Sequence, residues 1–159
     1  MIFRFFRFLT LIFGLSVSLF VISCNDNAAF DDNKDIDQKG WSFHDKPGFD
    51  VKIESPGVYN VFINLRHTDD YRYSNIFLLM YVTAPGQKEA EKRRVEVKLA
   101  EHDGHWLGNG SGNLYSRRVF VTDKIDFTKP GVYHFELEQN MRDEPLPEIT
   151  DVGIRIEKK

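Results

Sequence analysis

Residues 133–138 read Tyr-His-Phe-Glu-Leu-Glu, so apolar and polar side chains alternate at every step of this stretch. Successive side chains of a β-strand point to opposite faces, and the alternation therefore predicts a strand with one apolar and one polar face. The same period of two recurs in residues 94–99 and 154–157, and less regularly in residues 58–65. Such strands are typical of antiparallel sheets that cover a core with one face and meet water with the other.

A continuous apolar run, Ile-Phe-Leu-Leu-Met-Tyr-Val, occupies residues 76–82 and predicts a central strand that is buried on both faces. Residues 87–94 contain helix-forming residue types but no apolar stripe, so we expect a charged hairpin loop or a single turn there rather than a packed helix. Turn-forming residues recur about every ten positions. The predicted fold class is therefore all-β, an antiparallel β-sandwich of the jelly-roll or immunoglobulin-like kind.

Two segments of the chain echo each other. Residues 55–62 read Ser-Pro-Gly-Val-Tyr-Asn-Val-Phe, and residues 129–136 read Lys-Pro-Gly-Val-Tyr-His-Phe-Glu. Proline followed by glycine suits the two central positions of a type II turn, and a predicted strand follows each time. The echo is either a duplicated binding unit or a structural lead-in to two strands, and we favour the structural interpretation.

The beginning of the chain predicts export and lipid attachment. Arg4 and Arg7 precede an uncharged apolar stretch at residues 8–22, which is typical of a signal peptide and short for a membrane span. The stretch runs into Val-Ile-Ser-Cys, which resembles a lipobox, and this Cys24 is the only cysteine of the chain. Its thiolate is the group that accepts a diacylglycerol as a thioether. We expect residues 1–23 to be cleaved and Cys24 to be the lipidated first residue; an ordinary secretory signal or an uncleaved anchor are the alternatives.

Acidic and polar residues dominate the segment that follows. Residues 24–39 contain almost no apolar side chains, so we expect a disordered tether, with an acidic sorting signal as the alternative. Fully extended, this tether would reach on the order of 50 Å. The folded domain is then predicted to comprise residues 40–159. Cleavage removes two arginines and no acid, so the net charge of −3 becomes −5. This negative net charge argues against a nucleic-acid partner, and it argues against binding to anionic lipid through a polybasic segment.

The sequence offers little that is typical of catalysis. His102-Asp-Gly-His105 reads as a hairpin turn, with a weak surface metal site as the alternative. His67 with Asp69 and Asp70 reads as a polar loop at the end of a strand. The glycine-rich residues 108–113 lack the Gly-Lys-Ser/Thr and the following helix of a phosphate-binding loop. We therefore expect no enzymatic activity, no cofactor and no metal, and we do not expect a small-molecule ligand.

Aromatic residues and an arginine make a candidate surface for binding another protein. Trp, Tyr and Arg are the residue types that dominate interface hot spots. The candidates are Trp106 and Tyr115, which flank the glycine-rich loop, and Tyr71, Arg72 and Tyr73. For the tyrosines at 71 and 73, entry into a strand with the rings in the core is an equal alternative. A carbohydrate-binding surface is the second functional class that we consider.

Several segments, in their order and spacing, resemble the gliding-motility lipoprotein GldH family over nearly the whole chain. Besides the lipobox, these segments are Tyr-Arg-Tyr-Ser-Asn-Ile-Phe-Leu at 71–78, Asp-Gly-His-Trp-Leu-Gly-Asn-Gly-Ser-Gly-Asn-Leu-Tyr at 103–115, Pro-Gly-Val-Tyr-His-Phe-Glu-Leu-Glu-Gln-Asn-Met-Arg at 130–142 and Asp-Val-Gly-Ile-Arg-Ile-Glu at 151–157. The resemblance implies a lipoprotein of the cell envelope that is anchored in the inner or the outer membrane. We favour the outer membrane, with the protein facing either the periplasm or the cell surface. The resemblance also implies a role in gliding motility, through contacts with envelope proteins of the gliding and type IX secretion machinery. It supplies no defined site residues and no enzymatic activity.

Overall fold

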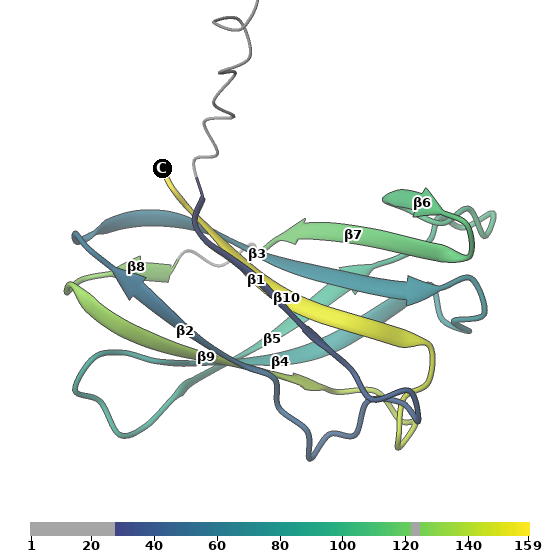
Figure 1. Ribbon diagram of the computed structural model, residues 1–159, viewed down its shortest axis with the longest axis horizontal. Coiled ribbons are helices and arrows are strands. Elements are labelled where there is room, and N and C mark those ends of the chain that lie inside the picture. The colour runs from purple at the N-terminus through teal and green to yellow at the C-terminus, as the bar shows by residue number, and fades with distance from the viewer. Residues whose placement is uncertain (1–27, 122–124) are drawn as a thin grey trace, which may run out of the picture.

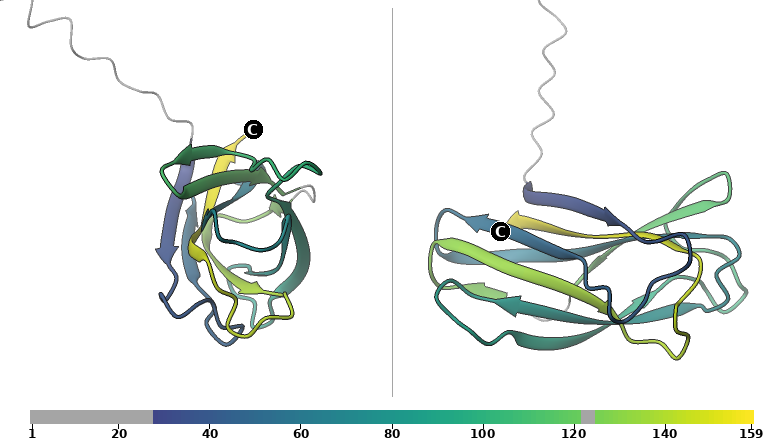
Figure 2. Two further views of the ribbon diagram at one scale, coloured as in Figure 1. Left: turned by 90° about the vertical axis from the view of Figure 1, so that its right-hand side faces the viewer. Right: turned by 60° about the horizontal axis from the view of Figure 1, so that its bottom comes forward.

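The computed structural model describes residues 28–121 and 125–159, and within these ranges the chain forms ten strands and no helix. The strands make two antiparallel sheets that face each other across the core, as the ribbon in Figure 1 and the turned views in Figure 2 show. The predicted all-β sandwich is confirmed. No part of the described chain is a helix with the length and apolar character needed to cross a membrane.

The first sheet has six strands within the described residues, in the order β1-β10-β3-β7-β6, with β8 beside the beginning of β3. Its strands are β1 (Ala28–Asp35), β3 (Gly57–Thr68), β6 (Asn109–Ser111), β7 (Leu114–Phe120), β8 (Ile125–Phe127) and β10 (Ile149–Lys158). β3 is the longest, and it pairs with β10 on one side and with β7 and β8 on the other. It therefore runs the length of the molecule and links its two ends.

The second sheet has the order β2-β9-β4-β5 among the described residues. Its strands are β2 (Gly48–Ile53), β4 (Asn75–Thr83), β5 (Glu91–Lys98) and β9 (Gly131–Gln139). The apolar run predicted to be central lies in β4, between β5 and β9, and most of its side chains are buried. The alternating stretches lie in β3, β5, β9 and β10, with their apolar residues turned into the core. These strand predictions are confirmed.

The Pro-Gly echo is structural. Tyr59 on β3 and Tyr133 on β9 are both buried, and both rings meet the ring of Phe127. Each tyrosine hydroxyl donates to the carbonyl oxygen four residues earlier, Ser55 at 2.9 Å and Lys129 at 3.1 Å. Each bond fastens the turn to the strand that follows it. The repeated motif therefore stabilises two turns. Its tyrosine side chain is buried in both copies and is not available to a partner.

The predicted tether is wrong for the residues that the structure describes. Residues 28–35 form strand β1, which pairs with β10, and the folded domain therefore begins at Ala28 instead of residue 40. Phe30 packs on the core, while Asp31 accepts hydrogen bonds from Arg155 at 2.6 Å and from Arg118 at 3.1 Å. Acidic side chains are compatible with an edge strand because they project from its outer face. Residues 1–27, including the predicted signal peptide and Cys24, lie outside the described residues.

The charged segment at 87–94 is partly a loop, as predicted, but its second half belongs to β5. β5 is an edge strand, where charged side chains on the exposed face discourage pairing with other chains. The guanidinium group of Arg94 also lies over the ring of Phe77 on the neighbouring strand, with its central carbon 4.0 Å from the ring centroid. A strongly charged sequence can therefore form a strand wherever its neighbour supplies apolar surface.

Candidate functional site

His67 is the centre of an aromatic cluster at the end of β3. Its side chain is inaccessible to solvent. The ring centroids of Trp106, Tyr71 and Tyr115 lie 4.6, 5.6 and 5.8 Å from that of His67, and the Tyr115 ring is nearly parallel to it at 16°. We call these four residues the His67 cluster. The four residues come from different parts of the chain: β3, β7 and the loops before β4 and β6. They come together because these elements meet at this end of the sandwich.

The position of His67 differs from the predicted polar loop, because His67 lies inside the molecule while Asp69 and Asp70 are exposed. Its Nδ1 is 2.7 Å from the carbonyl oxygen of Thr68, so this nitrogen carries the proton and donates it. The other ring nitrogen is buried and has no hydrogen-bond partner within the described chain. Burial, the largest influence, lowers the pKa of His67, and the neutral ring therefore acts as a packing element under the tyrosine and tryptophan rings.

The structure brings all five predicted contact residues to this end, with very different exposures. Tyr71 is only 3% exposed, so it belongs to the core and cannot contact a partner directly. Trp106, Tyr115 and Tyr73 are half-buried, and Arg72 is 68% exposed at its side chain. The core interpretation therefore holds for Tyr71 and the surface interpretation for Arg72.

The loop at residues 71–73 is held by a small set of hydrogen bonds. The Tyr71 hydroxyl donates to the carbonyl oxygen of Asn75 at 3.2 Å. The Tyr73 hydroxyl donates to the Asp143 carboxylate at 2.9 Å, and this bond, more than burial, raises the pKa of Tyr73. Burial raises the pKa of Tyr71 strongly. Both tyrosines therefore stay neutral and fix the backbone from which Arg72 projects.

Hollows flank this loop on both sides. A hollow of about 400 Å³ separates it from the turn that leads to Trp106, and one of about 200 Å³ lies toward the segment before β10. The first is lined by Tyr71, Arg72, Tyr73, Ser74, Lys98, Ala100, Glu101, His102, Gly104 and Trp106. We call the two hollows with the intervening loop the distal groove.

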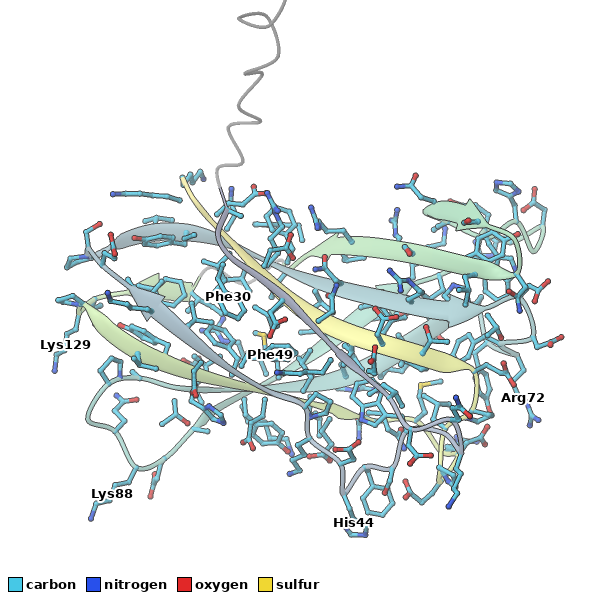
Figure 3. The ribbon with its side chains drawn as sticks, in the orientation of Figure 1. Phe30, His44, Phe49, Arg72, Lys88 and Lys129 are labelled. Carbon is cyan, nitrogen blue, oxygen red and sulfur yellow. The ribbon has the colours of Figure 1, made fainter. Side chains whose placement is uncertain are left out.

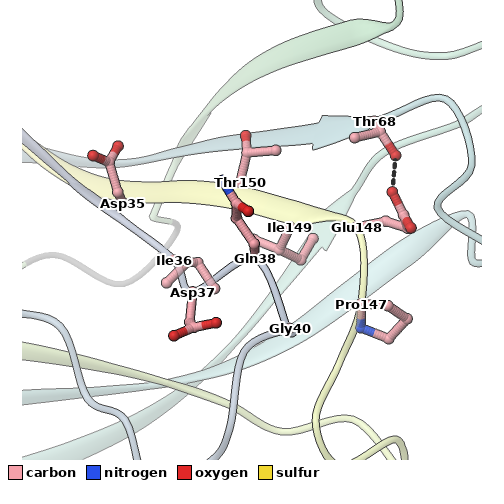
Figure 4. Close-up of a pocket in the computed structure, with 10 residues that line it drawn as sticks. All are labelled: Asp35, Ile36, Asp37, Gln38, Gly40, Thr68, Pro147, Glu148, Ile149 and Thr150. Carbon is pink, nitrogen blue, oxygen red and sulfur yellow. Dashed lines mark hydrogen bonds between the residues drawn. The ribbon is translucent and has the colours of Figure 1, made fainter.

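A third hollow, of about 430 Å³, adjoins the distal groove and is drawn in Figure 4. It lies between the end of β1 and the beginning of β10, and it shares Pro147 and Glu148 with the smaller hollow of the groove. Glu148 has φ of 69°, an unusual value for a residue with a side chain. Thr68 holds it there, since the hydroxyl of Thr68 donates to the Glu148 carboxylate and the amide of Thr68 donates to its carbonyl oxygen at 3.0 Å.

The two remaining motifs are structural turns. Residues 101–105 form the predicted turn, with the Glu101 amide donating to the His105 carbonyl at 2.8 Å and Gly104 at φ of 85°. His102 and His105 are exposed on it, and nowhere in the described ranges do three metal-ligating side chains gather. The glycine-rich residues form the β6–β7 hairpin. Gly108, at φ of 101°, lies against the carbonyl of Ser116, where a Cβ would collide.

Comparison with known proteins identifies the family. The family model described as GldH lipoprotein matches residues 28–156 of this chain. The chain belongs to the GldH lipoprotein family. The match begins at the first residue of β1, so the segment that the family model covers includes the strand that was predicted to be part of a tether.

Curated GldH relatives extend the match over nearly the full chain. "Gliding motility lipoprotein GldH homolog" of Christiangramia forsetii is 33% identical over 159 residues, which covers 95% of this chain and 96% of the relative. "Gliding motility lipoprotein GldH" of Flavobacterium johnsoniae is 29% identical over 154 residues, covering 91% and 94%. The predicted family resemblance is confirmed.

Solved structures add little to the GldH assignment. The "Structure of Eiger TNF from S. frugiperda" aligns with a TM-score of 0.33 and 13% identity, over 67% of this chain and 62% of that one. The "Crystal structure of infectious bursal disease virus VP2 subviral particle" aligns with a TM-score of 0.34 and 12% identity, over 81% of this chain and 30% of that one. Likenesses this weak carry no conclusion about function.

Proposed function

We propose that this protein is an envelope lipoprotein, anchored through Cys24, that serves gliding motility by binding another envelope protein through the distal groove. The names of the GldH relatives support the gliding role. The family description and the lipobox-like sequence before Cys24 support the lipid anchor. We further propose that the partner belongs to the gliding and type IX secretion machinery.

The distal groove is the observation that carries the binding proposal. Its loop presents an exposed arginine, Arg72, between two hollows, and Figure 3 shows that side chain projecting from one end of the molecule. Two members of the His67 cluster, Tyr71 and Trp106, line the larger hollow together with Arg72. An exposed arginine beside tyrosine and tryptophan side chains has the composition expected of an interface hot spot.

The chemistry of the groove favours a protein partner. Small-molecule sites are mostly apolar clefts with a few convergent polar groups. Arg72, Lys98 and Glu101 instead place charges of both signs along this groove, and all three are exposed. Lys98 and Glu101 form an ion pair at 2.5 Å. A surface with mixed charge at its rim and aromatic rings at its base fits the polar surroundings and apolar centre of a protein–protein interface.

The carbohydrate-binding alternative calls for a row of exposed aromatic rings on one sheet face. The rings on the outer face of the second sheet are covered by cations instead. Lys46 and Lys92 lie over Tyr81 at 4.7 and 5.4 Å from the ring centroid, and Arg94 covers Phe77. No observation on this face therefore favours a stacking site for sugars.

Arg72→Glu tests the proposal, with Lys88→Glu as the matched control. Both side chains are exposed cations, and Figure 3 shows them on opposite ends of the molecule. Arg72 is exposed and lies 3.9 Å from the half-buried Asp143, a long ion pair that adds little stability, so the variant is expected to fold. The lipidated protein is affinity-purified from its own envelope, and mass spectrometry identifies and quantifies the proteins recovered with it.

Loss of gliding and secretion proteins with Arg72→Glu, and their retention with Lys88→Glu, is the expected result. Equal thermal unfolding midpoints show that both variants are folded. Undiminished recovery of those proteins with Arg72→Glu would contradict binding through the groove.

A further inference from the structure

The first strand places the proposed lipid anchor close to the folded domain. Ala28 pairs with Glu157 of β10, and Cys24 precedes it by four residues. Four residues span at most about 14 Å when fully extended. A protein lipidated at Cys24 must therefore keep the beginning of β1 within about that distance of the bilayer surface. In Figure 1, β1 begins beside the end of β10, away from the loops of the distal groove.

Exposed apolar side chains lie in the same half of the molecule. Val58 begins β3 and is 41% exposed, while Val132 begins β9 and is 53% exposed. Phe120 ends β7 and is 43% exposed, with its ring against that of Phe62 at 5.5 Å. The large apolar side chains exposed within the described chain are these three and Phe43. Three of the four are therefore on the half of the sandwich nearest to the anchor.

Lysines accompany these apolar side chains. Lys52, Lys158 and Ala29 line a hollow of about 450 Å³ with Glu54 and Ser55 beside them. Lys158 donates to the Ser55 hydroxyl at 3.0 Å, and Lys159 donates its amide to the carbonyl of Val58. The Arg155 guanidinium donates a hydrogen bond to the nearby Glu157 carboxylate at 2.6 Å. Lys52 lies 3.8 Å from the Glu54 carboxylate, and both side chains are exposed. Although the whole chain is acidic, three lysines therefore lie near the first residues of β1.

We infer that this end of the sandwich, which we call the proximal end, rests on an anionic bilayer surface. The inference rests on the lipid anchor of the proposed function. Val58 and Val132 enter the headgroup region, and Lys52, Lys158 and Lys159 face the phosphates. Lysines near an anionic leaflet add electrostatic attraction to the hold of the lipid chains.

The orientation has a consequence for the distal groove. β3 begins at the proximal end with Gly57 and ends with Thr68 beside His67. Its length of 12 residues corresponds to on the order of 35 Å. A molecule resting on its proximal end therefore holds the distal groove away from the lipid, where an envelope protein has access to Arg72.

The test uses the mature lipidated protein in vesicles of phosphatidylethanolamine and phosphatidylglycerol. Val58→Cys and Val132→Cys, each labelled with the environment-sensitive dye NBD, report on the proximal end. His102→Cys, labelled in the same way, reports on the distal groove. Cys24 is blocked by its thioether when it is lipidated, so the introduced thiol is the one labelled. Lipids brominated along the acyl chain quench the dyes that enter the bilayer.

Quenching several-fold stronger at 58 and 132 than at 102 is the expected result. Replacing phosphatidylglycerol by phosphatidylcholine, or introducing Lys52→Glu with Lys159→Glu, should lower that quenching several-fold. Quenching that is absent at both 58 and 132, or that is equal or greater at 102, would overturn the orientation while leaving the anchor intact. Failure of the protein to float with vesicles, together with an unmodified mass for Cys24, would overturn the anchor and the orientation together.

Discussion

Tyr59 and Tyr133 lie in different sheets and pack edge-on against one ring, that of Phe127, with centroid distances of 5.1 and 4.7 Å. Each tyrosine belongs to one copy of the Pro-Gly-Val-Tyr motif, and each hydroxyl bonds to the turn before it. Phe127 comes from β8, a strand of three residues. Edge-to-face contacts of this kind add to the stability gained from burial. The three rings therefore join the two sheets at the proximal end.

Phe127→Ala should lower the free energy of unfolding by about 3–5 kcal/mol, because it leaves a cavity between the two tyrosines. Tyr59→Phe and Tyr133→Phe should each cost about 0.5–1.5 kcal/mol, since only a hydroxyl hydrogen bond is lost. Urea unfolding of the protein measures these values. Phe43→Ala is the control, because Phe43 is 40% exposed. A cost for Phe127→Ala no larger than that for Phe43→Ala would show that the ring cluster does not join the sheets.

His67 should make stability depend on pH. Burial lowers its pKa in the folded protein below the ordinary value near 6.5. Between those two pKa values the unfolded chain binds more protons than the folded one, so stability falls as the pH drops below about 6.5. The slope ends once the pH lies below the folded pKa as well.

His67→Phe should remove that part of the pH dependence, because the ring still packs with Trp106 and Tyr115 but no longer titrates. Unfolding free energies measured from pH 7.5 downward reveal the slope. His102→Gln, a change at an exposed histidine, should leave the slope in place. An identical slope in the wild type and in His67→Phe would assign the effect to other groups.

Gly153 should prove intolerant of any side chain. It lies in β10 opposite Asn33 of β1, and a Cβ at this position would meet the Asn33 side chain and the Asp32 carbonyl oxygen. Gly153→Ala should therefore push β1 off the sheet and destabilise the domain by about 1–3 kcal/mol, as other overpacked sites do. Hydrogen exchange at the amides of residues 30–35 should accelerate selectively.

Gly57→Ala is the matched control for that substitution, since its new Cβ would meet only the Tyr59 ring at an ordinary 3.6 Å. Unchanged exchange in β1 for Gly153→Ala would mean that β1 does not depend on close packing at Gly153.

The strands with alternating side chains were predictable because burial on one face imposes a period of two, as in the Tyr133 to Leu137 stretch. β1 was not, since an edge strand is held by backbone pairing and a few contacts such as Asp31 with Arg155. Its acidic composition is also that of an unfolded linker. The local sequence of a segment does not reveal whether an edge is available for pairing.

The candidate site was predictable in its residue types but not in its geometry. Trp106, Tyr115 and the residues at 71–73 were selected because tyrosine, tryptophan and arginine suit interfaces. Tyr71, Trp106 and Tyr115 converge on His67 in the folded structure. That convergence depends on the pairing of β3 with β7, which brings Tyr115 opposite His67. The polar neighbours of His67 suggested a loop, and only the sheet topology shows that its ring is turned inward.

A photo-activated crosslinker placed at position 72 of the lipidated protein in living cells tests the central claim most directly. The same crosslinker at position 88 serves as the control on the opposite end. Crosslinks from position 72 to proteins of the gliding and secretion machinery, absent from position 88, are the predicted result. Crosslinks to those proteins from position 88 but none from position 72 would contradict binding through the distal groove.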